Sequence, residues 1–157
     1  MDLKLKDKVV LITGASKGLG FETARMLAAE GALVAMNSRD ETRINQAAEK
    51  IRTQTGGNVY PFAGDVVNPV YSDQIINQVV SQLGRLDVLI TNTGGPPSGK
   101  FETFTDADWH NALEGNFLSH VRMIRTALPF LRQSSTPAVL AITSYSVKQP
   151  IPNLILS

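Results

Sequence analysis

The sequence predicts an α/β fold, in which a parallel β-sheet is covered by helices on both faces. Short apolar runs typical of buried strands alternate along the chain with longer segments whose apolar residues recur at helical spacing. Glycine, proline, asparagine or aspartate bounds most of these segments, as expected for turns and helix ends. Strands that alternate with helices form βαβ units, and such units build a parallel sheet.

The first two strands and helices are bounded by clear signals. Residues 8–13 are an apolar, β-branched run that predicts a strand, and the glycine-rich turn after it leads into a helix that Gly31 ends. Residues 32–37 predict the second strand. Asp40 is a suitable N-cap for the next helix, which residues 56–57, both glycine, end.

The middle of the chain repeats this pattern. Residues 58–63 predict the third strand. Asn68 followed by Pro69 is typical of an N-cap and a proline at the first helical position, and Gly84 ends that helix. Residues 86–91 predict the fourth strand.

The last third is expected to hold a loop, a long helix and a fifth strand. Residues 94–99 form a loop by composition. Residues 105–108 resemble a capping box, and the helix behind them is expected to run to Pro129. Residues 136–143 predict the fifth strand. The long helix is expected to bury a stripe of apolar residues, namely Trp109, Ala112, Leu113, Phe117, Val121, Ile124 and Leu128.

Composition limits the classes of function. At 157 residues, with 43% hydrophobic and 18% charged residues, the chain is expected to form one domain over residues 1–157. A net charge of +1 gives no reason to expect nucleic acid or a membrane surface as a partner. The sequence shows neither a membrane-spanning run nor a signal peptide, so we expect a cytoplasmic location. Without cysteine, and without a cluster of Asp, Glu and His at metal-ligand spacing, no metal site is expected.

The turn between the first strand and the first helix predicts a phosphate-binding site. Gly14, Gly18 and Gly20 fall within seven residues. Backbone can approach a pyrophosphate closely where no Cβ intervenes, and a helix N-terminus offers unpaired N–H groups and the positive end of the helix dipole. Strand, glycine turn and helix in this order favour a dinucleotide ligand.

The segment 13–20 resembles the cofactor motif of the short-chain dehydrogenase/reductase family, and later landmarks follow in order. Residues 65–66 resemble the family's adenine-contacting Asp and its neighbour. Residues 91–94 resemble its Asn-Asn-Ala-Gly motif with two replacements, Asn116 matches its mid-helix Asn, and Ser144 matches its catalytic Ser. The resemblance covers the whole chain.

The resemblance implies a Rossmann-like, doubly wound parallel sheet with strand order 3-2-1-4-5. It implies an NAD(P)-dependent oxidoreductase, similar to the 3-oxoacyl-carrier-protein reductase type, which acts on a small carbonyl or alcohol substrate. It also implies a homo-oligomer. The residues expected to hold the cofactor are Gly14, Ser16, Lys17, Gly18, Leu19, Gly20, Ser38, Arg39, Asp65, Val66, Asn92 and Gly94.

The end of the second strand predicts NADP(H) rather than NAD(H). A carboxylate there would bind the ribose 2′-hydroxyl and repel a 2′-phosphate. By the resemblance Ser38 takes that position, Arg39 follows it, and Lys17 adds a second cation. A hydroxyl and two cations suit a 2′-phosphate. The alternative interpretation is that both cations are ordinary solvated surface charges.

The expected catalytic residues are Ser144 and Asn116. By the resemblance the Ser144 hydroxyl would hydrogen-bond the substrate oxygen, and Asn116 would support a proton relay. Plainer interpretations are a strand-end hydroxyl for Ser144 and a satisfied core amide for Asn116. Likewise, Asp65 could form an Asx turn, and Asn92 could tie loop backbone together.

The C-terminal part departs from the family pattern. The family's proton-donating tyrosine lies about a dozen or more residues past the serine, with a lysine four beyond it. Thirteen residues past Ser144 stands Ser157, while Tyr145 and Lys148 are three apart and lie in the wrong segment. We therefore expect this chain, which breaks off after the fifth strand, to lack the Tyr/Lys pair and to be inactive.

Three alternatives stay open at this point. The chain could be a short form that binds NADP without catalysis, as a regulatory protein. Ser157 could stand in the tyrosine's position, as in divergent relatives. A different Rossmann-like class, such as a methyltransferase, is the third alternative.

Overall fold

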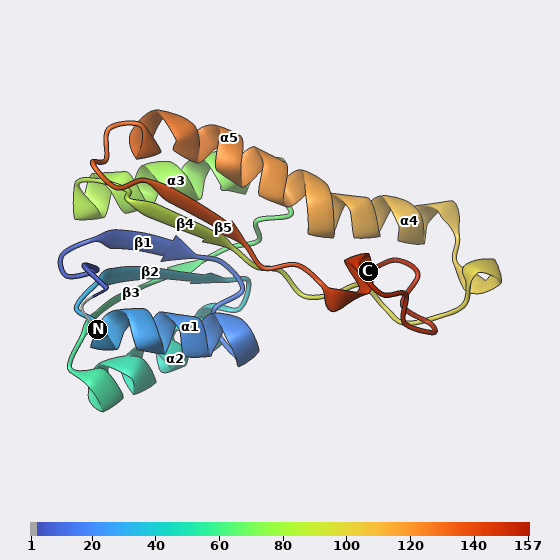
Figure 1. The fold of residues 1–157 in the computed structure, drawn as a ribbon, viewed down its shortest axis with the longest axis horizontal. Coiled ribbons are helices and arrows are strands. Elements are labelled where there is room, and N and C mark those ends of the chain that lie inside the picture. Colours follow the sequence, from blue (N-terminus) through green and yellow to red (C-terminus); the bar gives the residue numbers. More distant parts are fainter. Residues whose placement is uncertain (1–2) are drawn as a thin grey trace.

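Within residues 3–157, which the computed structural model describes, five parallel strands build one sheet in the order β3-β2-β1-β4-β5 (Figure 1). This confirms the expected α/β class, the Rossmann-like topology and the strand order. The strands are β1 (Val9–Ile12), β2 (Leu33–Ser38), β3 (Asn58–Ala63), β4 (Val88–Thr91) and β5 (Ala138–Ala141).

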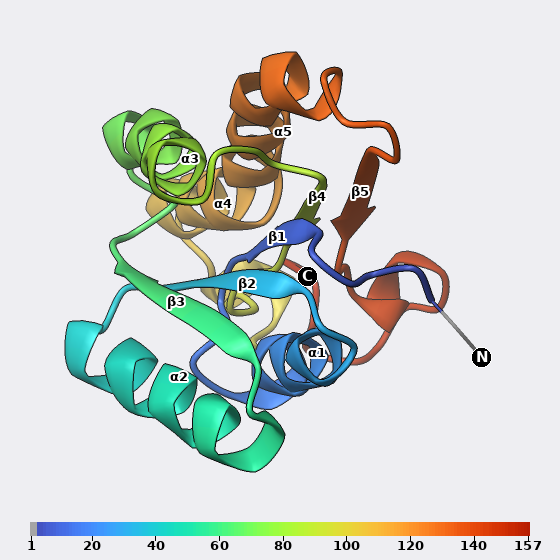
Figure 2. The ribbon, with the colours of Figure 1, turned by 90° about the vertical axis from the view of Figure 1, so that its left-hand side faces the viewer.

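Helices cover the sheet on both faces, with α1 and α2 on one side and α3 and α5 on the other (Figures 1 and 2). The helical segments are α1 (Gly18–Ala29), α2 (Glu41–Thr55), α3 (Pro69–Leu83), α4 (Asp106–Leu113), the π-helical turn η2 (Glu114–Leu118) and α5 (Ser119–Leu131). Two short 3₁₀ turns, η1 (Phe101–Thr103) and η3 (Tyr145–Val147), lie in the connections.

Alternate residues of β1 supply the two halves of the core. Val10 and Ile12 pack with α1 and α2, while Val9 and Leu11 pack with α3 and α5. All four are buried, as expected for a central parallel strand that is covered on both faces.

The predicted boundaries of the second and third helices are confirmed by their capping contacts. The Asp40 side chain accepts from the backbone N–H of Arg43 at the start of α2, and Asn68 caps α3. Gly56 and Gly84 end these helices in the left-handed conformation, which glycine adopts without steric cost. The capping box of residues 105–108 is also formed.

The long helix predicted behind that capping box is not continuous. The π-helical turn η2 interrupts it, and α5 continues through Pro129 to Leu131. Pro129 lies in the last turn of α5, where its missing N–H removes one helical hydrogen bond close to the end of the helix.

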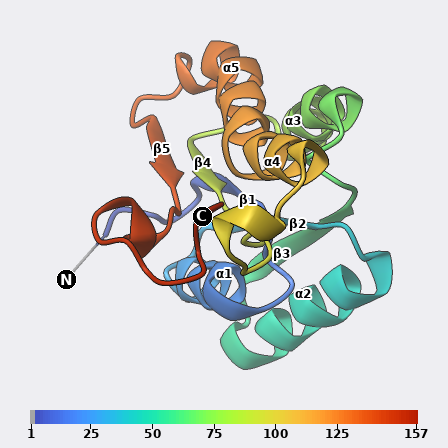
Figure 3. The ribbon, with the colours of Figure 1, turned by 90° about the vertical axis from the view of Figure 1, so that its right-hand side faces the viewer.

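The buried stripe predicted for this segment is also wrong in four positions. Leu113, Phe117, Val121 and Leu128 are exposed, while Met123, Ala127 and Leu131 form the buried face. Leu113 is the last residue of α4, which extends beyond the end of the sheet and has no strand beneath it (Figure 1), and Phe117 lies in the π turn η2 that follows. The side of α5 next to the sheet edge is not covered by any other element of residues 3–157 (Figure 3).

The fifth strand is shorter than predicted and lies at the edge of the sheet. All four of its residues are exposed, with Leu140 at 52% of its surface. The segment after it folds back beside the 94–99 loop, where the Gly99 N–H donates to the Asn153 carbonyl at 2.8 Å. None of the helices in residues 3–157 combines the length and apolarity that crossing a bilayer requires.

Candidate functional site

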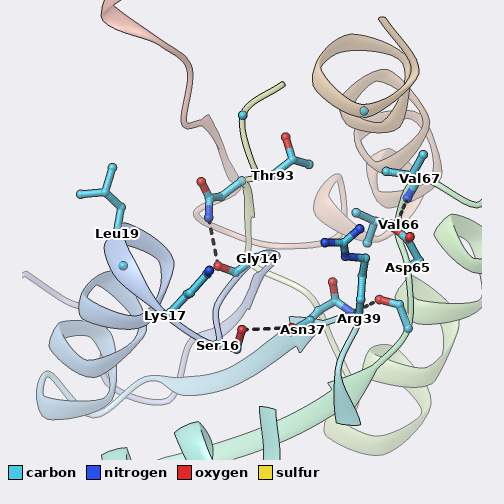
Figure 4. A pocket seen from close by; sticks show the side chains of 17 residues that line it. Gly14, Ser16, Lys17, Leu19, Asn37, Arg39, Asp65, Val66, Val67 and Thr93 are labelled. Carbon is cyan, nitrogen blue, oxygen red and sulfur yellow. Dashed lines mark hydrogen bonds between the residues drawn. The ribbon is translucent and has the colours of Figure 1, made fainter. Parts of the chain in front are cut away.

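A cleft of about 500 Å³ lies beyond the carboxyl ends of the strands (Figure 4). In an open parallel sheet this is where ligands bind, next to the point at which the strand order reverses. Of the residues predicted to hold a cofactor, Gly20 is the one that does not line it. The cleft is lined by Gly14, Ser16, Lys17, Gly18, Leu19, Asn37, Ser38, Arg39, Gly64, Asp65, Val66, Val67, Asn92, Thr93, Gly94, Gly95 and Gly115.

The glycine turn between β1 and α1 forms the floor of the cleft. Gly14 and Gly18 have φ values of +58° and +59°, which a residue with a side chain rarely adopts. Gly20 is buried beneath the turn, where an added Cβ would lie 2.4 Å from the Gly14 carbonyl oxygen. The turn therefore needs all three glycines, two for conformation and one for close packing.

Asn92 fastens this turn to the end of β4. Its side-chain amide donates to the Gly14 carbonyl at 3.1 Å. The Thr13 hydroxyl donates to the Asn92 carbonyl at 2.7 Å and accepts from the Asn92 N–H at 2.9 Å. The structure thus shows the tying role that the sequence left open for Asn92, and it also places this residue on the cleft.

The N-terminus of α1 opens into the cleft without a capping side chain. Lys17 takes the N-cap position, and its side chain accepts no backbone hydrogen bond. By contrast, Asp40, Asn68 and Thr105 cap α2, α3 and α4. The first N–H groups of α1 lack intrahelical partners by geometry, so an anion in the cleft would be their natural acceptor.

Two cations and two hydroxyls stand at the β2 side of the cleft. Ser38 donates to the Ser16 hydroxyl at 3.1 Å, which joins the end of β2 to the glycine turn. Lys17 and Arg39 reach the same cleft from these two segments (Figure 4). Neither cation forms an ion pair within residues 3–157, so both charges are available to a ligand.

The β3 side of the cleft is shaped by hydrogen bonds that sequence reasoning missed. The buried Asn37 side chain donates to the carbonyls of Phe62 and Gly64 at 3.1 and 3.0 Å. The Tyr71 hydroxyl donates to the Ala63 carbonyl at 2.8 Å, and the Tyr71 ring fills the space beside Gly64. An amide at the end of an otherwise apolar strand was the signal available for Asn37.

Tyr71 and Asp65 are the ionisable groups on this side of the cleft that form hydrogen bonds. Burial raises the pKa of Tyr71 above its usual value, although the hydrogen bond with Asn37 opposes this. Asp65 accepts from the Val67 N–H at 3.0 Å, so it does form the Asx turn proposed as its alternative role. It also lines the cleft, and the two roles are compatible because a carboxylate has two oxygens.

Asn116 lies in the π-helical turn, close to the cleft but not on its wall. The Thr93 hydroxyl donates to the Asn116 side-chain oxygen at 3.3 Å, and both Thr93 and Gly115 line the cleft. Arg122 connects the other end of this turn to the β3 loop, because its guanidinium donates to both Glu114 and the Val67 carbonyl. Isolated π turns of this kind are frequent at functional sites.

Ser144 lies outside the cleft, in a small group of hydroxyls at the start of η3. It accepts from the N–H and the hydroxyl of Ser146, at 3.1 and 2.6 Å. The Ser146 hydroxyl also lies 3.3 Å from that of Ser157. Tyr145 is exposed and donates to the Gln149 side chain, so it does not face the cleft.

The described residues contain no group of three or more His, Asp and Glu side chains that could hold a metal ion.

The fold and the cleft define a dinucleotide-binding α/β protein, and comparison with known proteins gives its family. Residues 8–156 match the family model described as short chain dehydrogenase, so the chain belongs to the short-chain dehydrogenase/reductase family.

Relatives of known sequence support this assignment. The chain is 32% identical over 155 residues to an uncharacterized oxidoreductase, YvrD, of Bacillus subtilis, covering 99% of this chain and 58% of that protein. It is 38% identical over 141 residues to 11-beta-hydroxysteroid dehydrogenase 1A of Arabidopsis thaliana, covering 89% and 40%. The chain thus spans about half the length of these relatives.

Solved structures share the fold closely. L-sorbose reductase of Gluconobacter frateurii, complexed with NADPH and L-sorbose, superposes with a TM-score of 0.95 at 29% identity, over 99% of this chain and 59% of that one. NADH-dependent reductase A1-R′, complexed with NAD, superposes with a TM-score of 0.90 at 30% identity, over 99% and 67%.

Proposed function

We propose that the cleft binds NADP(H), and that the protein is a short-chain oxidoreductase acting on a small carbonyl or alcohol substrate. The observation that carries this proposal is the uncapped N-terminus of α1, which faces the same cleft as Lys17, Ser38 and Arg39. A pyrophosphate would satisfy the free N–H groups, and a 2′-phosphate would accept from the hydroxyl and both cations.

NADP(H) is favoured over NAD(H) by the absence of a carboxylate at the end of β2. Ser38 stands there and hydrogen-bonds Ser16, so nothing at this position repels a 2′-phosphate. Among the structural relatives, one is complexed with NADPH and one with NAD. The choice for this chain therefore depends on its own residues.

The bound cofactor would supply the hydride, and the chain's residues would hold it and the substrate. The backbone of the glycine turn and the N-terminus of α1 would bind the phosphates, and Asp65 would accept from the adenine amino group. We assign Ser144 to the substrate oxygen and Asn116 to proton relay, as the family resemblance implies.

A non-catalytic NADP-binding protein is the second candidate, and one observation favours it. Tyr145, the tyrosine next to Ser144, lies outside the cleft, and its hydroxyl donates to the Gln149 side chain. NADPH binding without turnover would support this candidate over a reductase.

We further propose that the protein forms a homo-oligomer through the exposed apolar side of α4, η2 and α5. Leu113, Phe117 and Val121 expose 54%, 60% and 39% of their surfaces along this side. Clustered apolar exposure of this kind is typical of an interaction surface. The mass of the protein in solution, measured by light scattering, tests this proposal.

The cofactor preference is tested by the substitution Arg39→Asp. It replaces a cation with a carboxylate beside the expected 2′-phosphate, so the ratio of NADPH to NADH affinity should fall by about 10- to 100-fold. Arg132→Asp makes the same charge change beyond the end of α5 and should leave the ratio unchanged. An unchanged ratio in the Arg39→Asp variant would show that the assignment is wrong.

A further inference from the structure

A buried histidine joins the end of β4 to the π-helical turn. His120 is 8% exposed and lies on α5, four residues after Asn116. The chain's other histidine, His110, is exposed and contacts the Asp106 carbonyl within its own helix.

Both ring nitrogens of His120 contact threonine hydroxyls that follow one another along β4 and its loop. Nδ1 lies 2.9 Å from Oγ1 of Thr91, and Nε2 lies 3.3 Å from Oγ1 of Thr93. Thr93 in turn contacts the side-chain oxygen of Asn116 at 3.3 Å. The result is one continuous path of hydrogen bonds from the buried strand end, through the ring, to the turn.

The donors and acceptors on this path have one consistent arrangement. Asn116 presents an oxygen, which can only accept, so the single hydroxyl proton of Thr93 goes there. Thr93 must then accept from His120, whose proton is on Nε2. Burial lowers the pKa of His120, which favours the neutral ring, and in this tautomer the unprotonated Nδ1 accepts from Thr91.

The path ends on the β4 side of the cleft. Thr93 lines the cleft together with Gly94, Gly95 and Gly115. In a doubly wound sheet each half holds one mononucleotide unit. The 2′-phosphate side at Ser38 and Arg39 belongs to β2, so the β4 side is left for the nicotinamide half.

We propose that His120 is a positioning residue, which holds Thr93 and Asn116 in place for the nicotinamide half of the cofactor. This inference rests on the proposed dinucleotide site. The loop after β4 holds three glycines and two prolines within residues 94–99 and forms no strand, and η2 departs from the α-helical hydrogen-bond pattern. A side-chain connection between the loop and η2 therefore adds order that regular secondary structure does not supply. The imidazole supplies that connection.

The test compares two ligands on three variants. NADPH carries the nicotinamide half, and 2′-phospho-ADP-ribose lacks the nicotinamide ring. In His120→Leu, NADPH affinity should fall about tenfold because Thr93 loses its donor, while affinity for 2′-phospho-ADP-ribose should stay within about twofold.

The conservative variants identify which nitrogen matters. His120→Gln places an amide N–H near the Nε2 position and should recover NADPH affinity to within about threefold of the wild type. His120→Asn reaches only the Nδ1 position and should behave like the leucine variant. His110→Gln is the matched control and should leave both affinities unchanged. If the leucine variant does not fold, Thr93→Val, which removes the hydroxyl at nearly constant volume, should give the same difference between the ligands.

The tautomer gives an independent readout on the wild-type chain. Nitrogen-15 NMR should show His120 neutral and protonated on Nε2 at neutral pH, with the signals assigned by their persistence in His110→Gln. A proton on Nδ1, or equal losses for both ligands in His120→Leu, would overturn the inference alone. Failure of the wild-type chain to bind either ligand would overturn the proposed dinucleotide site as well.

Discussion

The β1–β4 centre of the sheet and the β5 edge are built from similar apolar residues, yet they have opposite environments. Leu89 of β4 is fully buried, while Leu140, on the neighbouring strand, is 52% exposed. The centre is covered by helices on both faces, and the cleft stands at its carboxyl end. The glycine turn between β1 and α1 therefore follows a strand that is buried on both faces.

Ser144, the candidate catalytic serine, lies on the exposed β5 side of the molecule. Ser144 follows the exposed strand β5, and its side chain accepts hydrogen bonds from Ser146 within its own segment. Asn116 accepts a hydrogen bond from Thr93, which follows β4 and lines the cleft, so Asn116 is connected to the centre of the sheet. The proposed cofactor site is therefore built on packing within residues 3–157, whereas Ser144 follows a strand whose residues are all exposed.

The largest expected effect tests the difference in burial between β4 and β5. Leu89→Ala should lower the free energy of unfolding by about 2–5 kcal/mol, because it leaves a cavity in a closed core. Leu140→Ala should cost less than about 1 kcal/mol, because the side chain is already half in water. Urea unfolding followed by circular dichroism measures both. Equal losses would show that the β5 face is covered in solution.

The next effect concerns the glycine turn. In Gly20→Ala the new Cβ would lie 2.4 Å from the Gly14 carbonyl oxygen and 2.9 Å from the Asn92 amide nitrogen, so the turn must shift. NADPH affinity, measured by fluorescence titration, should fall tenfold or more. Met26→Ala, an exposed change on the same helix, is the control and should bind as the wild type does. Unchanged affinity in Gly20→Ala would show that the cofactor does not use this turn.

The third effect depends on pH and concerns Asp87, which links the start of β1 to the segments before β4 and after α5. Its buried carboxylate accepts from the Val9 N–H, the Ser134 hydroxyl and Arg85. Burial acts to raise its pKa, but these hydrogen bonds and the charge of Arg85 outweigh burial, so the pKa lies below its usual value. A lowered pKa in the folded state stabilises the fold above the unfolded-state pKa, and this contribution is lost as the pH falls through the folded value.

Asp87→Asn tests that contribution. It should cost about 1–3 kcal/mol at neutral pH, because Arg85 loses its charged partner. The difference from the wild type should shrink as the pH falls below about 4, where the carboxylate of the unfolded state begins to be protonated, and should go on shrinking until the native carboxylate is protonated as well. Chemical unfolding at several pH values measures this. A difference that stays constant between pH 7 and pH 3 would contradict the role given to the carboxylate.

The features that the sequence predicted well are those set by near neighbours. Asp40, Asn68, Gly56 and Gly84 act on the backbone within a few residues, so their pattern identifies the helix ends. The glycine turn is likewise read from seven consecutive residues.

The features that could not be predicted depend on residues distant in the chain. His120 meets Thr91, 29 residues away, only because α5 packs over β4. The exposed side of α5 is apolar, as a buried side would be, so periodicity alone assigns it to the core. The π turn also lacks a local signal, since residues 105–129 show regular helical spacing.

The central claim is that this cleft is a dinucleotide site selective for a 2′-phosphate. Isothermal titration calorimetry of the wild-type chain with NADPH and with NADH tests it most directly. We predict that NADPH binds and that its affinity exceeds that of NADH by about tenfold or more, because Lys17 and Arg39 have no other ionic partner within residues 3–157. Equal affinities, or binding of neither nucleotide, would contradict the account.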